Sequence, residues 1–194
     1  MLESRFAGLG ELRIHQADAL KFDFCQLSPG PAQLRVVGNL PYNISTPLLF
    51  HLLNFRDRII DMHFMLQKEV VERMAAQPGR KAYGRLGIML GCHLQIEPLF
   101  DVDRLAFNPP PDVTSAVVRL DPLPDGTYTI DNHAALSELV TTAFMPRRKT
   151  LRNALKQLAG AEDFVAVGSD AGLRPEQIAI AEYIALSNHL LRKS

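Results

Sequence analysis

The stretch that decides the fold is Leu34-Arg35-Val36-Val37-Gly38-Asn39-Leu40-Pro41-Tyr42, an apolar run that ends in an Asn-Leu-Pro-Tyr turn. Residues 34–38 predict a short, largely buried β-strand. Asn and Pro are ordinary turn formers, so the last four residues alone would indicate only a turn. Their position after a buried strand indicates a ligand site as well, because open α/β sheets bind ligands at the carboxyl ends of their strands.

The four residues of this turn carry groups that suit methylation of an exocyclic amine of a nucleobase. An adenine amine is a poor nucleophile because its lone pair is delocalised into the ring. The side-chain oxygen of Asn39 and the carbonyl of Leu40 can accept its hydrogens and favour a pyramidal nitrogen. Pro41 restricts the backbone of Leu40, and Tyr42 offers a ring on which a flipped base can stack.

Strands and helices alternate through the first part of the chain. Strands are predicted at residues 12–17, 34–38, 61–66, 93–102 and 115–120. Helices are predicted at residues 46–53, from 68 onwards and over 84–93. The first of these is expected to have Thr46 as its cap and Pro47 in its first position. The alternation favours a mainly parallel sheet covered by helices on both faces.

A proline-rich segment, Asp121-Pro122-Leu123-Pro124-Asp125-Gly126, predicts a linker. Beyond it the pattern is helical. Helices are expected at residues 134–144 and 147–159, near residue 163, and up to residue 191. We therefore expect an α/β domain over residues 1–122 and a small all-α domain over residues 123–194.

Two further segments are candidates for the same site. Asp18 follows the strand predicted at residues 12–17, where its carboxylate can accept from an adenine amine while a neighbouring amide donates to the ring. Phe107 precedes Asn108-Pro109-Pro110-Pro111, a stiff loop that can hold its ring ready to stack on the other face of a base. Alone, Asp18 would be a cap or turn residue and Phe107 a core side chain.

Five basic residues with no acidic residue among them form the clearest electrostatic feature: Arg147, Arg148, Lys149, Arg152 and Lys156. On one helix, Arg148, Arg152 and Lys156 would share a face. A charged stripe is usually just a solvated face, but a run of a single sign favours contact with a phosphate backbone. Lys81 and Arg85 can extend this surface.

Composition narrows the class of protein. A chain of 194 residues with 47% hydrophobic content can hold one ordinary domain and a smaller one. The formal net charge is zero, so a nucleic-acid partner would have to bind a local patch. Cys25 and Cys92 are far apart in the sequence, which fits reduced thiols better than a disulfide. No stretch is long and apolar enough for a membrane span, and the six histidines lack metal-ligand spacing. These features predict a soluble, cytoplasmic protein with reduced thiols, no membrane partner and no metal.

Together, these segments resemble the ribosomal RNA adenine dimethyltransferase family, the small-subunit dimethyladenosine transferases. The matching segments are, in family order, residues 18–20, 38–47, 66–70, 83–86, 107–113 with 115, and 147–153. The resemblance implies an S-adenosylmethionine-dependent enzyme that dimethylates two adjacent adenines near the 3′ end of 16S rRNA. It also implies a Rossmann-like methyltransferase domain, and a helical C-terminal domain that helps dock on the immature small ribosomal subunit.

The resemblance also assigns roles to residues. Asp18 and Ala19 would bind the adenine of the cofactor, and Asn39 would lie beside both the methionine moiety and the target amine. Tyr42 and Phe107 would sandwich the target base. No general base is needed, because the amine attacks an activated sulfonium and can lose its proton afterwards.

The chain departs from the family pattern in its first part. Family members carry a first strand followed by a Glu-x-Gly-x-Gly loop that cradles the methionine end of the cofactor. A second strand then ends in an acidic residue that binds the ribose. Neither occurs in these 194 residues. We therefore expect an N-terminally truncated methyltransferase domain with an exposed sheet edge, and weak or no cofactor binding by this chain.

Two other functions stay open at this point. One is methylation of large-subunit rRNA, against which the Phe107 loop and the Arg-Arg-Lys run weigh. The other is a non-catalytic ribosome-assembly or RNA-binding factor, which the missing cofactor loop favours and the intact residues 39–42 disfavour. A DNA adenine methyltransferase fits less well, because those enzymes usually carry Pro where Leu40 stands.

Overall fold

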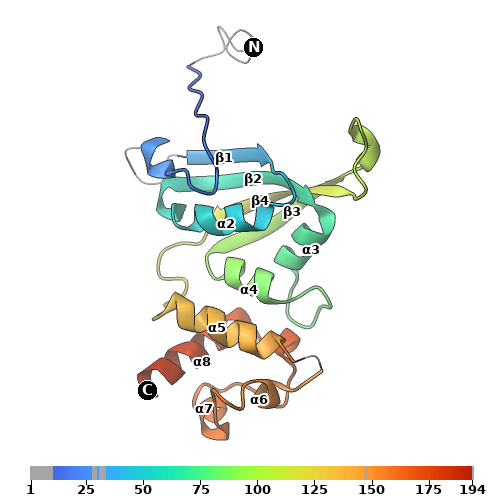
Figure 1. Ribbon diagram of the computed structural model, residues 1–194. Helices are drawn as coiled ribbons and strands as arrows, with labels where there is room; N and C mark the ends of the chain where they lie inside the picture. The colour runs from blue at the N-terminus through green and yellow to red at the C-terminus, as the bar shows by residue number, and fades with distance from the viewer. Residues whose placement is uncertain (1–10, 28–29, 31–33, 147, 194) are drawn as a thin grey trace.

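The computed structural model describes residues 11–27, 30, 34–146 and 148–193. Figure 1 shows a sheet with three helices against it and a second group of helices below. The strands are β1 (Leu34–Asn39), β2 (Ile59–Gln67), β3 (Leu94–Val102) and β4 (Ser115–Pro122). The helices against the sheet are α2 (Ser45–Leu53), α3 (Lys68–Ala75) and α4 (Arg85–Gly91). Short 3-10 turns are η1 (Phe24–Leu27), η2 (Arg56–Arg58) and η3 (Arg104–Ala106).

The order of the described strands is β1-β2-β4-β3, which leaves β1 at one edge. β1 and β2 run parallel, whereas β4 runs antiparallel to both β2 and β3. The prediction of a mainly parallel sheet is therefore wrong for these strands. β4 follows β3 without a crossover helix, so the chain turns back and β4 enters between β2 and β3.

One face of the sheet carries the core. Met62, Phe64 and Leu66 of β2 are at most 1% exposed and pack against α2, α3 and α4. The alternate residues of β2 are polar or half-exposed, and Val37 on β1 is 72% exposed. Among the described residues, helices thus cover one face of the sheet, not both. The alternation in β2 is typical of a one-sided sheet, not of a strand buried on both faces.

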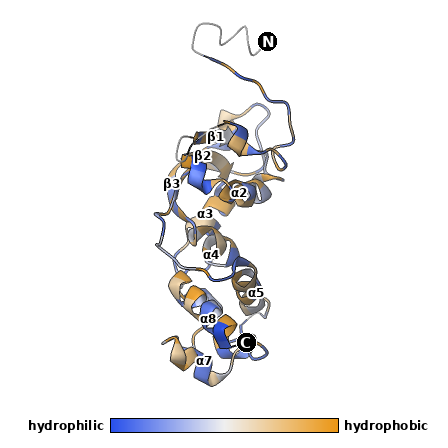
Figure 2. Cartoon of the chain, turned by 90° about the vertical axis from the view of Figure 1, so that its left-hand side faces the viewer, coloured by the Kyte–Doolittle hydropathy of each residue, from blue (hydrophilic) through white to orange (hydrophobic). Residues whose placement is uncertain are grey.

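The helices after the sheet are α5 (His133–Phe144), α6 (Leu151–Ala154), α7 (Ala161–Ala166) and α8 (Ile180–Lys193), with a 3-10 turn η4 at Pro175–Gln177. They enclose a second apolar core that also includes Ile88, Met89 and Cys92 from α4 and its end. Figure 2 shows α4 between the sheet and α5. Because Leu90 faces the first core, α4 joins the two.

The long helix predicted over residues 147–159 is wrong. Of the described residues 148–159, only α6 (Leu151–Ala154) is helical, and Arg148 has a left-handed φ of 66° that interrupts a helix. The amides of Leu151 and Arg152 donate to the carbonyls of Leu173 and Ala171. This loop contact fixes where α6 begins, which the local pattern could not predict.

The helix after the Asn-Leu-Pro-Tyr turn also begins differently. α2 starts at Ser45, with Ile44 in the cap position and no side-chain cap, so Thr46 is not the cap and Pro47 is the third helical residue. Proline is still tolerated there because the first-turn amides lack intrahelical partners.

The strand predicted at residues 12–17 is absent, since these residues have no regular structure. Leu12 and Ile14 are about half exposed, at 46% and 51%. A strand needs a hydrogen-bonded neighbour, and none of the described strands pairs with this segment. Further on, the chain packs through Ala19, Leu20 and Phe24 onto the first core.

Candidate active site

The site is built where β1 ends. Asn39 is the last residue of β1 and stands opposite Met65 of β2, and the amide of Leu40 donates to the Met65 carbonyl over 3.3 Å. The Leu40 side chain is buried, whereas Asn39 is exposed. The buried Leu40 thus fixes the backbone next to an accessible amide.

Two acceptors at this point are free. Among the described residues, neither the side chain of Asn39 nor the carbonyl of Leu40 takes part in a hydrogen bond. Acceptors of this kind are available to the hydrogens of a ligand amine. The use of these two acceptors to bind an adenine amine stays a prediction.

The turn after Leu40 is closed by its own hydrogen bonds. The amide of Ile44 donates to the Pro41 carbonyl over 3.1 Å, and the Ser45 hydroxyl donates to the Tyr42 carbonyl over 3.0 Å. Ser45 is buried, so the second bond is shielded from water. The turn is therefore ordered before any ligand binds.

Tyr42 is held from across the sheet. Its Oη lies 2.7 Å from the Oγ of Ser115, the fully buried first residue of β4. Sequence reasoning missed this role of Ser115, because the two residues are 73 positions apart. Their contact becomes visible only when the order of the strands is known.

Phe107 lies in the β3–β4 connection, which ends at Ser115. Its ring is half-buried, and its amide donates to the Arg104 carbonyl over 3.2 Å as the last bond of η3. The Asp103 carboxylate accepts from the Leu105 amide over 2.8 Å and caps the same turn. Phe107 is thus on an ordered loop at the same end of the sheet as Tyr42, because β4 begins opposite the end of β2 and β1 ends beside it.

Lys68 and Asp101 form an ion pair near this end, with 2.6 Å between Nζ and Oδ2. The hydrogen bond with the Asp101 carboxylate raises the pKa of Lys68. The amide of Lys68 donates to the Thr114 carbonyl over 3.0 Å, beside Ser115. The sequence analysis did not single out this pair.

Asp18 occupies a turn instead of a strand end. Its Oδ1 accepts from the Leu20 amide over 3.0 Å, and its Oδ2 is 4.0 Å from the Lys21 ammonium. Among the described residues, no hydrogen bond or ion pair joins Asp18 to Asn39 or Tyr42. The structure thus gives Asp18 the turn role that the sequence analysis named as its ordinary alternative, and it leaves the predicted role in cofactor binding untested.

The basic residues of the C-terminal half are exposed, but they do not share one helix. Arg147 lies outside the described residues. Arg148 and Lys149 are in the turn before α6, Arg152 is on α6, and Lys156 follows it. None of these four described side chains takes part in an ion pair. The prediction of one helical stripe is wrong, whereas an exposed and unpaired basic cluster remains.

Arg85 and Lys81 are exposed as well. Arg85 opens α4, and its Nη2 donates to the Ser137 Oγ of α5 over 3.4 Å. A side-chain carbon placed on Gly84 would lie 3.8 Å from the ring of Phe144, at the end of α5. Arg85 therefore lies beside α5, whose end leads to Arg148.

Comparison with known proteins agrees with this geometry. Residues 1–190 match the family model described as ribosomal RNA adenine dimethylase. The chain is 56% identical over 183 residues to "Ribosomal RNA small subunit methyltransferase A" of Shewanella loihica, covering 94% of this chain and 68% of that protein. It is 54% identical over 190 residues to the protein of the same name from Pseudomonas fluorescens, covering 98% and 70%.

Solved structures give the same result at the level of the fold. A dimethyladenosine transferase from Plasmodium falciparum superposes with a TM-score of 0.79 at 25% identity, covering 95% of this chain and 75% of the other. The 23S rRNA methyltransferase ErmE superposes with a TM-score of 0.73 at 21% identity, covering 97% and 76%.

The fold and the site define a methyltransferase of the Rossmann-like class with a helical C-terminal region, as the sequence predicted. Within that class, the chain belongs to the ribosomal RNA adenine dimethylase family, which is a family of enzymes. Membership implies the use of S-adenosylmethionine as methyl donor. In the part of the chain that the structure describes, no helix has the length and apolar character to cross a membrane, and no cluster of His, Cys, Asp or Glu could hold a metal ion.

The described residues fit S-adenosylmethionine in part. The Asp18 side chain is exposed, and the Ala19 amide makes no described hydrogen bond, so an acceptor and a donor for an adenine edge are available. Asn39 has an exposed side-chain amide without a described hydrogen bond, which is available to a ligand. The glycine loop and the ribose-binding carboxylate of the family have no counterpart in these 194 residues.

Proposed function

We propose that this chain carries the base-binding and RNA-binding parts of an enzyme that dimethylates two adjacent adenines near the 3′ end of 16S rRNA. The substrate would be the immature small ribosomal subunit, and the methyl donor S-adenosylmethionine. The observation that carries the proposal is the pair of free acceptors, Asn39 Oδ1 and Leu40 O, next to a tyrosine held by Ser115.

Each residue has a distinct task in the proposed reaction. S-adenosylmethionine, when bound, supplies a methyl group on a positively charged sulfur. Asn39 Oδ1 and the Leu40 carbonyl would accept the two hydrogens of the adenine amine, which directs its lone pair outward. Tyr42 and Phe107 would stack on the two faces of the flipped base, and Pro41 would keep the Leu40 carbonyl in place. Asp18 and Ala19 would hold the adenine of the cofactor.

RNA binding is assigned to the exposed basic residues. Arg148, Lys149, Arg152 and Lys156 lack ion-pair partners among the described residues, so a phosphate backbone would not have to displace a carboxylate. We include Arg147, Lys81 and Arg85 in this surface. Residues 1–122 would form the methyltransferase domain and residues 123–194 the domain that docks on the ribosome, with α4 packed into both cores.

The test uses undermethylated small subunits, tritiated S-adenosylmethionine at millimolar concentration, and this chain. Radioactivity is expected in 16S rRNA, and Asn39→Ala should lower it by at least tenfold, as for loss of one positioned hydrogen-bonding group. Asn54→Ala is the matched control, because Asn54 is an exposed amide at the other end of α2. It should leave the rate unchanged.

Other results of this methylation test would support a different function for the chain. Label found only in large-subunit RNA would support the large-subunit alternative. RNA binding without label at any cofactor concentration would support a non-catalytic assembly factor, which the absence of a Glu-x-Gly-x-Gly sequence favours. Full activity of Asn39→Ala would refute the role of the Asn39 amide while leaving the family membership intact.

A further inference from the structure

A polar pocket lies away from the proposed active site, at the junction of the two cores. It has a volume of about 220 Å³ and is lined by Arg56, His93, His133 and the segment 123–130. Arg56 precedes β2 and His93 precedes β3, so the pocket is at the end of β2 opposite to Gln67. The nine residues of β2 span about 27 Å, so the pocket is far from Asn39.

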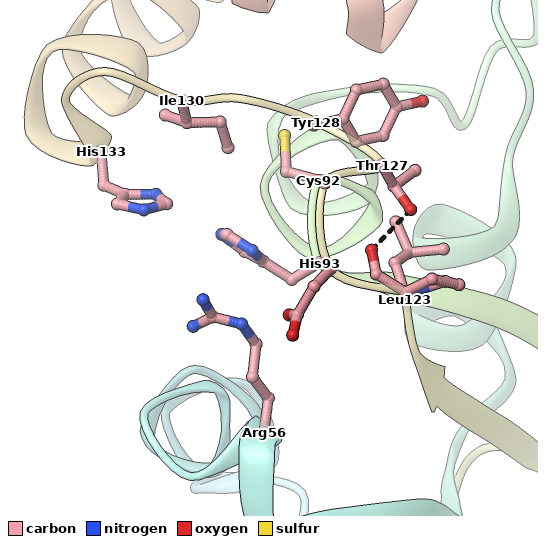
Figure 3. Close-up of a pocket in the computed structure, with 11 residues that line it drawn as sticks. Arg56, Cys92, His93, Leu123, Thr127, Tyr128, Ile130 and His133 are labelled. Atoms are coloured by element: carbon pink, nitrogen blue, oxygen red, sulfur yellow. Dashed lines mark hydrogen bonds between the residues drawn. The ribbon is translucent and has the colours of Figure 1, made fainter.

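Three side chains that can carry positive charge converge in this pocket. Figure 3 shows Arg56, His93 and His133 pointing toward a common space. The centroids of the two imidazole rings are 5.0 Å apart. The three side chains come from separate segments, η2, the start of β3 and the start of α5, and are brought together only by the fold.

Among the described residues, no carboxylate forms an ion pair with Arg56, His93 or His133. The described hydrogen bond of the Arg56 guanidinium is a long one, 3.4 Å to the Leu53 carbonyl. Asp125 lines the same pocket but forms no described ion pair with Arg56. The other titratable neighbours, Cys92 and Tyr128, add no positive charge, and burial raises the pKa of the Cys92 thiol to about 12. The Arg56 guanidinium is therefore unpaired among the described residues and can bind an anion, while Asp125 contributes one negative charge to the lining.

The surroundings of the pocket also change the pKa of His93. Burial, together with repulsion from His133 and Arg56, lowers the pKa of His93 to about 4. A bound anion would relieve this repulsion and favour the charged imidazole. A pocket with arginine and histidine side chains around one space suits a phosphate, because guanidinium and imidazole N–H groups can donate to its oxygens.

The walls of the pocket are ordered. The amide of Leu123 donates to the His93 carbonyl over 2.8 Å. The side chain of Asn188 on α8 donates to the Thr129 carbonyl over 2.7 Å and accepts from the Asp131 amide over 3.0 Å. The Asn132 side chain caps the first turn of α5, next to His133. The segment 123–131, which begins inside the predicted linker, is thus fixed at both ends, and most of it lines the pocket.

We propose that Arg56, His93 and His133 form a phosphate-binding site, separate from the methyl-transfer site. A water molecule occupies about 30 Å³ in the liquid, so the pocket has room for a phosphate group and several waters. The phosphate would be either a phosphodiester of an RNA strand or the phosphate of a free nucleotide. The site does not depend on methyl transfer, because none of its residues belongs to the proposed active site.

The experiment follows the imidazole C2 protons of His93 and His133 by NMR while the chain is titrated with inorganic phosphate, with ADP or with a short single-stranded RNA. Saturable shifts are expected, and bound phosphate should move the titration midpoint of the His93 imidazole to higher pH. Arg56→Gln should weaken binding by about tenfold, because it removes a charge-assisted hydrogen bond. His133→Gln should weaken it as well.

Arg174→Gln is the matched control, since Arg174 is an exposed arginine of another segment, and it should bind like the unchanged protein. Tighter binding of RNA than of ADP identifies the RNA backbone as the source of the phosphate, and the reverse order identifies a nucleotide. The proposal is overturned if none of the three probes gives saturable shifts, or if Arg56→Gln and His133→Gln both bind unchanged. Methylation is not measured, so failure here is distinct from failure of the proposed function.

Discussion

The hydroxyl groups of Tyr42 and Ser115 share a hydrogen bond of 2.7 Å. It joins the turn after β1 to the first residue of β4, which directly follows the loop that carries Phe107. The two aromatic residues proposed to stack on the target base are therefore coupled through Ser115. A base inserted between them would meet one ring whose position is already fixed.

Removal of this hydrogen bond should weaken base binding without unfolding the protein. A hydrogen bond of this kind contributes about 1 kcal/mol, so Ser115→Ala should lower kcat/KM for the RNA substrate about fivefold. Most of the change should be in KM, because the role proposed for Tyr42 is to position the base and not to react. The measurement is methyl transfer to undermethylated small subunits over a range of RNA concentrations.

Two variants make this prediction specific. Tyr42→Phe removes the same hydrogen bond, so the double variant with Ser115→Ala should lose little more than either single variant. Ser187→Ala is the matched control, because the Ser187 hydroxyl is buried without a described hydrogen-bond partner. Additive losses in the double variant would show that Ser115 does not act through Tyr42.

The basic cluster should determine how RNA binding responds to salt. Neutralising Arg152 or Lys156 as Gln should lower the affinity for a 16S rRNA hairpin and reduce the slope of log affinity against log salt by about 0.7 to 0.9 per residue. Fluorescence anisotropy of labelled RNA measures both. Arg13→Gln is the control, because Arg13 is already paired with Glu11. An unchanged slope in both cluster variants would exclude phosphate contacts there.

The sequence predicted the parts of the fold that depend on local pattern. β1 and its turn, β2, α4 and α5 all lie where apolar spacing and turn residues indicated. Local pattern could not decide two points, namely whether residues 12–17 form a strand and in which direction β4 runs. Residues 12–17 alternate like a strand but have no described neighbour to pair with, and β4 alternates equally well whether it runs parallel or antiparallel.

Local sequence could indicate only part of the candidate site. Asn39, Leu40 and Tyr42 lie within four consecutive residues, so the local sequence shows them together. Ser115 reaches Tyr42 across the sheet, and the phosphate pocket is assembled from separate segments, so neither has a local signal. The expected helix through Arg148 failed because contacts of α6 with residues 171–173 override its helical pattern.

Cofactor affinity should be low for this chain. Asp18 and Ala19, which are proposed to bind the adenine, are present, but a Glu-x-Gly-x-Gly loop is not found in these 194 residues. With Asn39 as the one residue proposed for the methionine end and none proposed for the ribose, the dissociation constant for S-adenosylmethionine should be in the millimolar range. Isothermal titration calorimetry measures it directly, and a micromolar constant would contradict this prediction.

The C-terminal helices should lose stability in acid through Asp163, whose side chain is 3% exposed. The Lys193 ammonium donates to its Oδ1 over 2.8 Å, the Gly160 amide donates to its Oδ2 over 2.8 Å, and His189 Nε2 lies 3.0 Å from its Oδ1. These contacts, the Lys193 bond first, lower the pKa of Asp163 to about 2. In the unfolded chain an aspartate has a pKa of about 3.9.

Because the folded-state pKa is the lower one, the stabilisation is fully present above about pH 4 and is lost as the pH falls toward 2. Asp163→Asn should therefore lower the free energy of unfolding at neutral pH and flatten its pH dependence between about pH 4 and 2. Urea unfolding followed by circular dichroism at a series of pH values measures this. Glu162→Gln is the matched control, since Glu162 binds the same lysine but its side chain is 71% exposed, and it should change the profile less. An unchanged acid profile in Asp163→Asn would show that this carboxylate does not link the helices to pH.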